Sequence, residues 1–178
     1  MTLNRQSWVE AARDLMSQKS VDAVKVEVLA RNLNVSKGSF YWHFKNRDEL
    51  LDELLAYWET VTDELIDYSK EDSNPKGQLS RLFFAIAEAG VSGEESIHIW
   101  AKRDQDVADT VRHVEAKRMA YLQAIFEQAG FPERAARERA EITYLAFLGY
   151  AFKLSQDSAF NLSFTDLGKE IITIMFKE

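Results

Sequence analysis

The residues with the clearest chemistry lie at positions 37–45, where the sequence reads KGSFYWHFK. Phe40 and Phe44 are four residues apart, so on a helix they share one face and pack inward. The remaining face and its flanks carry small, hydrogen-bonding and aromatic residues: Lys37, Gly38, Ser39, Tyr41, Trp42 and His43. A short helix that buries two Phe and exposes such a set must present it to a partner, and the major groove of DNA suits it.

The preceding residues predict the element that positions this helix. Leu29, Ala30 and Leu33 have the spacing of one apolar helical face. Asn34 follows, and Asn is one of the few residues that adopt a left-handed conformation at low cost. Ser36 is a good N-cap for a second helix. The segment therefore reads as two short helices joined by a tight turn, which is a helix-turn-helix.

The rest of the chain predicts further helices and no strands. Two Pro, seven Gly and few alternating β-branched runs among 178 residues favour an all-α protein. Periodicity and capping signals predict about nine helices, at residues 4–17, 26–33, 37–44, 46–69, 78–89, 94–102, 105–129, 133–156 and 166–176. Asn46 and Glu49 have the spacing of a capping box at the start of the fourth of these helices. The clearest loop is KEDSNPKG at residues 70–77. Residues 142–152 are apolar all round, which predicts burial on every side.

Charge divides the chain into two parts. Residues 1–47 carry eight Lys or Arg and four Asp or Glu, a net +4, whereas residues 48–178 carry a net −11. A basic segment joined to an acidic one is expected when only the first contacts phosphate. We therefore expect a DNA-binding domain at residues 1–47 and a helical body at residues 48–178.

Composition argues against several other classes. The chain has no Cys, so disulfides, thiolate chemistry and zinc–thiolate sites are excluded. His98 and His113 lack metal-ligand spacing, and no Ser-His-Asp order or Gly-rich phosphate loop occurs. We expect no catalytic residues, metal or cofactor. An amphipathic N-terminus and the lack of an apolar run of about 18 residues predict a cytoplasmic protein.

The motif at residues 29–51, LARNLNVSKGSFYWHFKNRDELL, resembles the DNA-binding motif of the TetR family of transcriptional regulators. The similarity is strongest over roughly residues 5–55. Asn34 stands where the family commonly has Gly, and Lys25 stands where Ser or Thr usually caps the second helix. The resemblance implies an all-α fold with a three-helix DNA-binding head. It also implies a body that binds a small molecule and forms a homodimer through the last two helices.

The side chains expected to touch DNA fall into three groups. Ser36, Tyr41, His43 and Lys45 would hold phosphates; Lys37, Gly38, Ser39 and Trp42 would read bases; Lys25 and Arg47 would extend the positive rim. The Lys37 ammonium, at the start of its helix, can also reach a phosphate. Gly38 would act by letting the helix approach the base edges. Alternatively, Tyr41 and Trp42 could pack internally, and His43 could form a local cap or pair.

The body offers candidates for a ligand cavity because an aromatic ring with a polar tip suits a pocket. These candidates are Trp58, Phe84, Trp100, Tyr121 and Tyr144, although such residues are often simply core. Arg118 interrupts an apolar stripe, so it either pairs internally with an acid such as Asp104 or Asp106 or meets an anionic ligand. Ala146 and Gly149 would permit a close helix approach in a dimer; alternatively, residues 133–156 form the central helix of a monomer.

These features together predict a repressor that binds a palindromic operator as a dimer and is released by a small-molecule effector. An activator, or an architectural DNA-binding protein without an effector, is the alternative. An enzyme carrying a helix-turn-helix-like head is a third possibility, which the charge division and the exposed aromatic helix disfavour.

Overall fold

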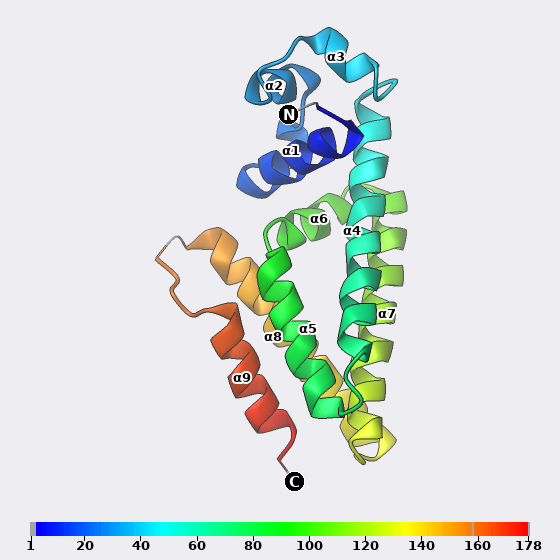
Figure 1. The fold of residues 1–178 in the computed structure, drawn as a ribbon, viewed down its shortest axis with the longest axis vertical. Coiled ribbons are helices and arrows are strands. Elements are labelled where there is room, and N and C mark those ends of the chain that lie inside the picture. The colour runs from blue at the N-terminus through cyan, green and yellow to red at the C-terminus, as the bar shows by residue number, and fades with distance from the viewer. Residues whose placement is uncertain (1–2, 158, 178) are drawn as a thin grey trace. The chain divides into compact units, whose positions relative to one another are not determined.

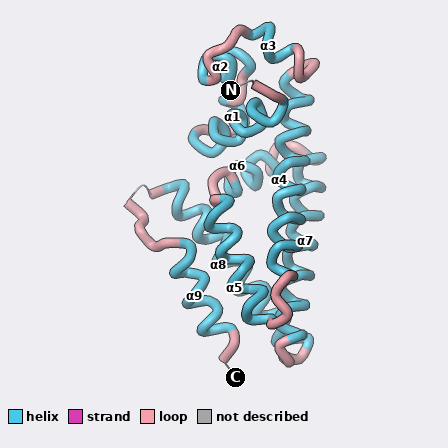
Figure 2. Tube along the Cα trace, viewed as in Figure 1, coloured by secondary structure: helices cyan, strands magenta, loops and turns pink. Residues whose placement is uncertain are grey.

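The computed structural model describes residues 3–157 and 159–177, and every regular element within them is a helix (Figures 1 and 2). The elements are α1 (Arg5–Gln18), the 3₁₀ helix η1 (Val21–Ala23), α2 (Val26–Asn32), α3 (Lys37–Tyr41), α4 (Arg47–Lys70), α5 (Pro75–Ala89), α6 (Glu94–Ala101), α7 (Gln105–Gln128), α8 (Glu133–Gln156) and α9 (Phe164–Met175). The predicted all-α fold is confirmed. No helix in the described part of the chain is long and apolar enough to cross a membrane.

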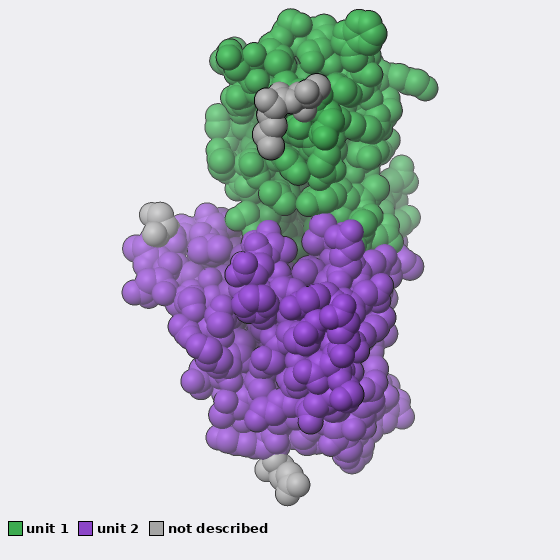
Figure 3. All heavy atoms as spheres, in the orientation of Figure 1, with its two compact units in different colours: residues 1–60, 92–111 green, residues 61–91, 112–178 purple. Residues whose placement is uncertain are grey.

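The chain forms two compact units (Figure 3). The first contains residues 1–60 and 92–111, and the second contains residues 61–91 and 112–178. Helices α4 and α7 contribute to both. Helix α6, expected in the body, belongs to the first unit together with the start of α7. The predicted boundary after residue 47 separates the residues expected to bind DNA from the rest, whereas the two units are defined by packing. That functional boundary stays a prediction.

The first unit is built around the apolar face of α1. Trp8 on α1 contacts Phe40 on α3 edge to face, with ring centroids 5.3 Å apart, and both side chains are fully buried. Helix α6 is fastened to the same unit by Ser96, whose hydroxyl donates to the Met16 carbonyl over 3.2 Å. Arg103, just after α6, pairs with Asp22 in η1 at 3.2 Å. Residues 92–103 therefore support the head rather than standing apart from it.

Local signals explain most helix boundaries. Asn34 has φ of 56°, as the predicted tight turn requires. The side-chain oxygen of Asn46 accepts from the Glu49 N–H over 2.9 Å, so the predicted cap of α4 is present. Lys25 provides no side-chain cap for α2. Helix α5 begins at Pro75, earlier than predicted, because Pro suits the first position of a helix and Asn74 caps it.

Helix α3 ends at Tyr41, whereas the periodic pattern predicted a helix to Phe44. The Phe40 carbonyl accepts from both the His43 and Phe44 amides, over 2.9 and 3.0 Å. This shared acceptor keeps Phe44 beside Phe40 while the chain leaves the helix. Spacing therefore predicted the inward direction of Phe44 correctly and its secondary structure wrongly.

The second unit packs α5, α8 and α9 with the remainder of α4 and α7. Gly168 on α9 lies so close to α5 that an added Cβ would come within 2.7 Å of the Phe83 ring. Phe83 and Phe164 contact each other at 5.3 Å between centroids. The prediction that the middle of α8 is buried on every side is wrong within this chain, where Ile142, Leu145 and Phe152 are 49%, 64% and 57% exposed. Their spacing puts all three on one face of α8.

Candidate nucleic-acid interface

Helix α3 and the turn after it are held by two inward Phe side chains. Phe40 and Phe44 are almost completely buried and their rings stack 5.3 Å apart. The prediction that both face inward is confirmed. Because these two rings fix the helix from beneath, the opposite face is left for solvent or a partner.

The outward side of α3 and the following turn carries exposed aromatic and polar groups. Tyr41 is 61% exposed, although its ring meets the Phe40 ring edge to face with 5.3 Å between centroids. Trp42 is 88% exposed, so its side chain is not a packing residue in this chain. Of the other predicted contacts, Lys25, Ser36, Lys37, Gly38 and Lys45 are exposed, and Ser39, His43 and Arg47 are partly exposed. An indole this open to water has no function within the protein interior, and it is available to a binding partner.

Gly38 is not required by packing inside the protein. A Cβ added at this position would meet only the Ser36 hydroxyl, at an ordinary contact distance of 3.5 Å. The backbone of α3 is helical there, so no left-handed conformation demands glycine. A requirement for a bare backbone at Gly38 would therefore come from outside the chain.

Lys37 is engaged with α2. Its ammonium lies 2.6 Å from a carboxylate oxygen of Glu27, and both side chains are about half exposed. The hydrogen bond from Lys37 is the main reason that the pKa of Glu27 lies below its ordinary value. Sequence reasoning did not find Glu27 because the pairing depends on how α2 and α3 cross.

Arg47 braces the connection between η1 and α2. Its guanidinium donates to the carbonyl oxygens of Val21 and Val24, with a distance of 2.6 Å to Val21. Asp48 lies 3.9 Å away. These contacts stabilise the head from within, and a place for Arg47 on the DNA-binding rim stays a prediction.

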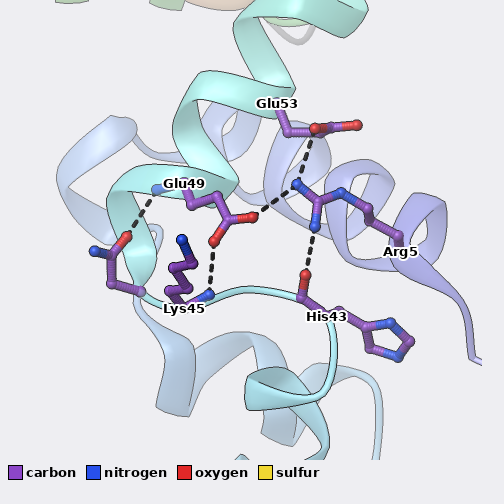
Figure 4. A network of polar contacts seen from close by, with 6 residues as sticks. Arg5, His43, Lys45, Glu49 and Glu53 are labelled. Carbon is purple, nitrogen blue, oxygen red and sulfur yellow. Dashed lines mark hydrogen bonds and ion pairs between the residues drawn. The ribbon is translucent and has the colours of Figure 1, made fainter.

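A polar network joins α1 and α4 to the turn that follows α3 (Figure 4). Arg5, the first residue of α1, donates to the His43 carbonyl and to the carboxylates of Glu49 and Glu53. Glu49 also accepts from the Lys45 backbone N–H over 2.7 Å. Arg5 was not among the residues selected from the sequence, since it lies 38 positions from His43.

The predicted ligand-lining residues are divided between the two units. Trp58 and Trp100 belong to the first, where the Trp58 indole N–H donates to Glu94 over 2.9 Å and Trp100 is part of the core. Phe84, Arg118, Tyr121 and Tyr144 belong to the second. Phe84 is 53% exposed, so it faces the surface of its unit.

Within the second unit, two candidates make polar contacts from α7 to α4. Arg118 donates to the Thr62 hydroxyl over 2.9 Å, and its guanidinium lies 5.5 Å from the centre of the Phe147 ring. The Tyr121 hydroxyl lies 2.6 Å from that of Ser69, and burial is the main reason that the pKa of Tyr121 is raised. Asp104, one of the acids considered for Arg118, accepts from the backbone N–H of Asp106 and caps α7.

The first unit contains a cavity of about 290 Å³. It is lined by residues of both charges together with apolar ones: Val21, Asp22, Arg47, Asp48, Leu51, Asp52, Trp100, Arg103 and Asp104. Among the described residues, no group of three or more His, Cys, Asp or Glu side chains is placed to hold a metal ion.

Comparison with known proteins finds similarity to transcriptional regulators, both in sequence and in fold. The family described as "Bacterial regulatory proteins, tetR family" matches residues 9–54. The tetracycline repressor protein class D of Escherichia coli is 38% identical over 113 residues, covering 61% of this chain and 50% of that protein. The chain thus matches about half the length of this curated relative.

Two solved structures extend the likeness to the whole fold. A transcriptional regulator from Rhodococcus sp. Rha1 superposes with a TM-score of 0.75 at 18% identity, covering 98% of this chain and 94% of that one. The transcriptional regulator FadR from Bacillus subtilis, solved in complex with stearoyl-CoA, gives a TM-score of 0.66 at 14% identity, covering 97% and 98%.

Proposed function

Because the chain belongs to the TetR family of DNA-binding transcriptional regulators, we propose that it is a dimeric repressor controlled by a small molecule. In this proposal α3 and its turn enter the major groove of each half of a palindromic operator. An effector in the second unit then favours a state that does not fit both half-sites.

The single observation that carries this proposal is the outward surface of α3 and its turn. Tyr41 and Trp42 are exposed beside Lys37, Ser39 and Lys45. The helix and turn that carry these side chains are held in place by the buried Phe40 and Phe44. The indole of Trp42 can cover a thymine methyl group or a sugar, and the cationic and hydroxyl groups can hold phosphates. Gly38 leaves room for the backbone to approach the bases.

An exposed apolar stripe on α8 supports dimerisation. Ile142, Leu145 and Phe152 recur at intervals of three and seven residues, and Gly149 lies among them. A Cβ added to Gly149 would have nothing within 4 Å, so this glycine is not demanded by packing inside the protomer. Ile174 on α9 is also about half exposed. A second copy applied here would cover this apolar area. A palindromic operator would then require the two recognition helices of the dimer to lie about 34–36 Å apart.

The polar groups between α4 and α7 support an effector site in the second unit. Arg118 with Thr62, and Tyr121 with Ser69, provide hydrogen-bonding groups beside apolar core. A ligand that draws Arg118 or Tyr121 away from α4 would alter the contacts of the helix that leads from the recognition turn. A roughly 100-fold release from DNA needs about 2.7 kcal/mol of differential affinity between the two states.

An activator, or an architectural protein with no effector, would use the same DNA surface. A regulator with an effector differs from a protein without one in whether a small molecule weakens DNA binding, and a release screen distinguishes the two. If DNA is bound but no small molecule weakens binding, the alternative without an effector is favoured.

Selection of bound sequences from a random double-stranded library tests the proposal. We expect an inverted repeat to be enriched, with half-sites about one helical turn apart. Release from that sequence would then be screened with tetracycline and stearoyl-CoA, the compounds named for two similar proteins, and with a wider set of metabolites. Absence of any enriched sequence would reject the proposed function.

A further inference from the structure

The turn between α3 and α4, residues 42–46, carries three of the proposed DNA contacts and has no helical hydrogen-bond ladder of its own. Its Phe44 ring stacks on Phe40 in the core, while Trp42 and Lys45 are exposed. A turn of this kind has several accessible conformations unless other groups hold its backbone. Its hydrogen bonds to α1 and α4 are therefore of functional interest.

Arg5 holds the turn from the side of α1 (Figure 4). One guanidinium nitrogen donates to the His43 carbonyl, and the other lies 3.1 Å from Glu49 and 3.0 Å from Glu53. The guanidinium carbon sits 4.2 Å from the centre of the Phe44 ring. The planar fork of arginine makes these contacts simultaneously, which a lysine ammonium could not reproduce.

Glu49 closes the network from the side of α4. One of its carboxylate oxygens accepts from Arg5, and the other accepts from the Lys45 backbone N–H over 2.7 Å. The turn is thus held at the carbonyl of His43 and at the amide of Lys45, by two side chains that also bind each other. These bonds are why the pKa of Glu49 is lowered, with the Lys45 amide contributing most.

The side chains of this network are too exposed for their ion pairs to add much to the overall folding stability. The Arg5, Glu49 and Glu53 side chains are each a third or more exposed, and ion pairs with that much solvent contact contribute little to global folding. Their main effect is therefore local, because Arg5 and Glu49 fix the His43 carbonyl and the Lys45 amide of one turn.

We propose that Arg5 is a positioning residue for DNA recognition, which acts with Glu49 by fixing the backbone of residues 43–45 so that Trp42, His43 and Lys45 meet the groove together. The proposal rests on the proposed DNA-binding function. It adds a residue of α1 that does not itself need to touch DNA.

Charge-matched variants test this proposal. Arg5→Gln removes the network, whereas Arg13→Gln removes the same charge from the same helix at a residue that pairs with its neighbour Asp14. We expect Arg5→Gln to weaken operator binding roughly tenfold more than Arg13→Gln does. Arg5→Lys keeps the charge but not the fork, and it should rescue only part of the loss.

Glu49→Gln separates positioning from electrostatics by the sign of its effect. Removing a negative charge near DNA should tighten binding if charge alone matters. We expect weaker binding instead, because the Lys45 amide loses its carboxylate acceptor. Asp48→Asn, which removes a neighbouring exposed acid, is the matched control and should leave affinity equal or tighter. The double variant Arg5→Gln/Glu49→Gln should lose less than the two single losses combined.

Hydrogen exchange on the free protein supplies a readout that does not depend on DNA. In Arg5→Gln, we expect faster exchange confined to the amides of residues 43–45, with the amides of α2 unchanged. Uniformly faster exchange across the head, or equal affinities for Arg5→Gln and Arg13→Gln, would overturn the proposal. If the unaltered protein binds no DNA, the proposed function fails and the recognition role of Arg5 fails with it. Local exchange would still report whether Arg5 holds the turn.

Discussion

Two surfaces of the protein expose large apolar side chains, and their surroundings differ. At the end of α3 and in the turn that follows it, Tyr41 and Trp42 lie among hydroxyl groups and cations, and the backbone of the turn is held by Arg5 and Glu49. On α8, Ile142, Leu145 and Phe152 follow one helical face with a glycine among them. Exposure alone is therefore uninformative about a partner, and the neighbouring groups indicate its chemistry.

The two surfaces also differ in what fixes the positions of their side chains. A regular helix such as α8 sets the spacing of its side chains without help, so a second copy can be accommodated by shape alone. The recognition turn has no such regularity, and it depends on side chains from α1 and α4 for its conformation. We expect DNA binding to be sensitive to substitutions that make no contact with DNA, and dimerisation to be sensitive mainly to residues in the interface.

The largest expected effect comes from the α8 surface. Leu145→Glu should convert a dimer into monomers in sedimentation or light scattering. It should weaken binding to the full palindrome by at least about 100-fold, because the second half-site is no longer engaged by the same complex. Phe84→Glu, on an exposed position of α5, is the control and should keep the mass of the unaltered protein. An unchanged mass for Leu145→Glu would remove α8 from the interface.

A smaller loss is expected from the recognition surface itself. Trp42→Ala should weaken operator binding roughly tenfold or more, while the melting temperature stays the same because this indole packs against little of the protein. Binding by fluorescence anisotropy and melting by circular dichroism give the two quantities. A fall in melting temperature with unchanged affinity would reassign Trp42 to structure.

An increase in affinity is expected from Glu27→Gln. Glu27 holds the Lys37 ammonium at 2.6 Å, so DNA phosphate must compete with this carboxylate. Removing it should strengthen operator binding about two- to fivefold, the range for an exposed ion pair, and most clearly at low salt. Glu10→Gln on α1, which removes the same charge elsewhere in the head, should produce a smaller change. Weaker binding by Glu27→Gln would indicate that the ion pair orients Lys37 for DNA.

The smallest expected effect is on the pH dependence of folding stability, and it involves carboxyl groups of both regions. The pKa values of Glu27 and Glu49 in the head are lowered, as are those of Asp157 and Asp166 near α8 and α9, where Lys153 and Lys169 are the main causes. A carboxyl with a lowered folded pKa stabilises the protein above its ordinary pKa, and this contribution disappears as pH falls through the lowered value. Urea unfolding should therefore show declining stability below about pH 4.5, and the decline should be modest because all four carboxyl groups are at least partly exposed to solvent. Glu49→Gln should make the decline shallower; an identical decline would exclude Glu49 as a contributor.

Sequence patterns predicted the local features of the recognition region. The four-residue spacing of Phe40 and Phe44 gave their inward direction, and Asn34 and Asn46 marked a left-handed turn and a helix cap that the structure contains. These signals depend on neighbouring residues only. The contact of Arg5 with the turn and the pairing of Lys37 with Glu27 depend on how helices cross, so no periodicity reports them.

The body was harder to predict because its aromatic residues serve several purposes. Trp100 is in the core of the first unit, Phe84 is exposed, and Tyr121 contacts Ser69. An aromatic side chain is compatible with all three surroundings, so its type alone does not distinguish them. Likewise, the apolar middle of α8 suggested complete burial, whereas one chain alone covers only part of it.

The most direct test of the account is the salt dependence of operator binding for Lys37→Ala and Tyr41→Phe beside the unaltered protein. Removing one cationic side chain from a phosphate should reduce the slope of log affinity against log salt by about 0.9, hence about 1.8 for the two copies in a dimer. We predict weaker binding and a shallower slope for Lys37→Ala, and weaker binding for Tyr41→Phe. Unchanged affinity and slope in both variants would contradict the docking of α3 and its turn on DNA.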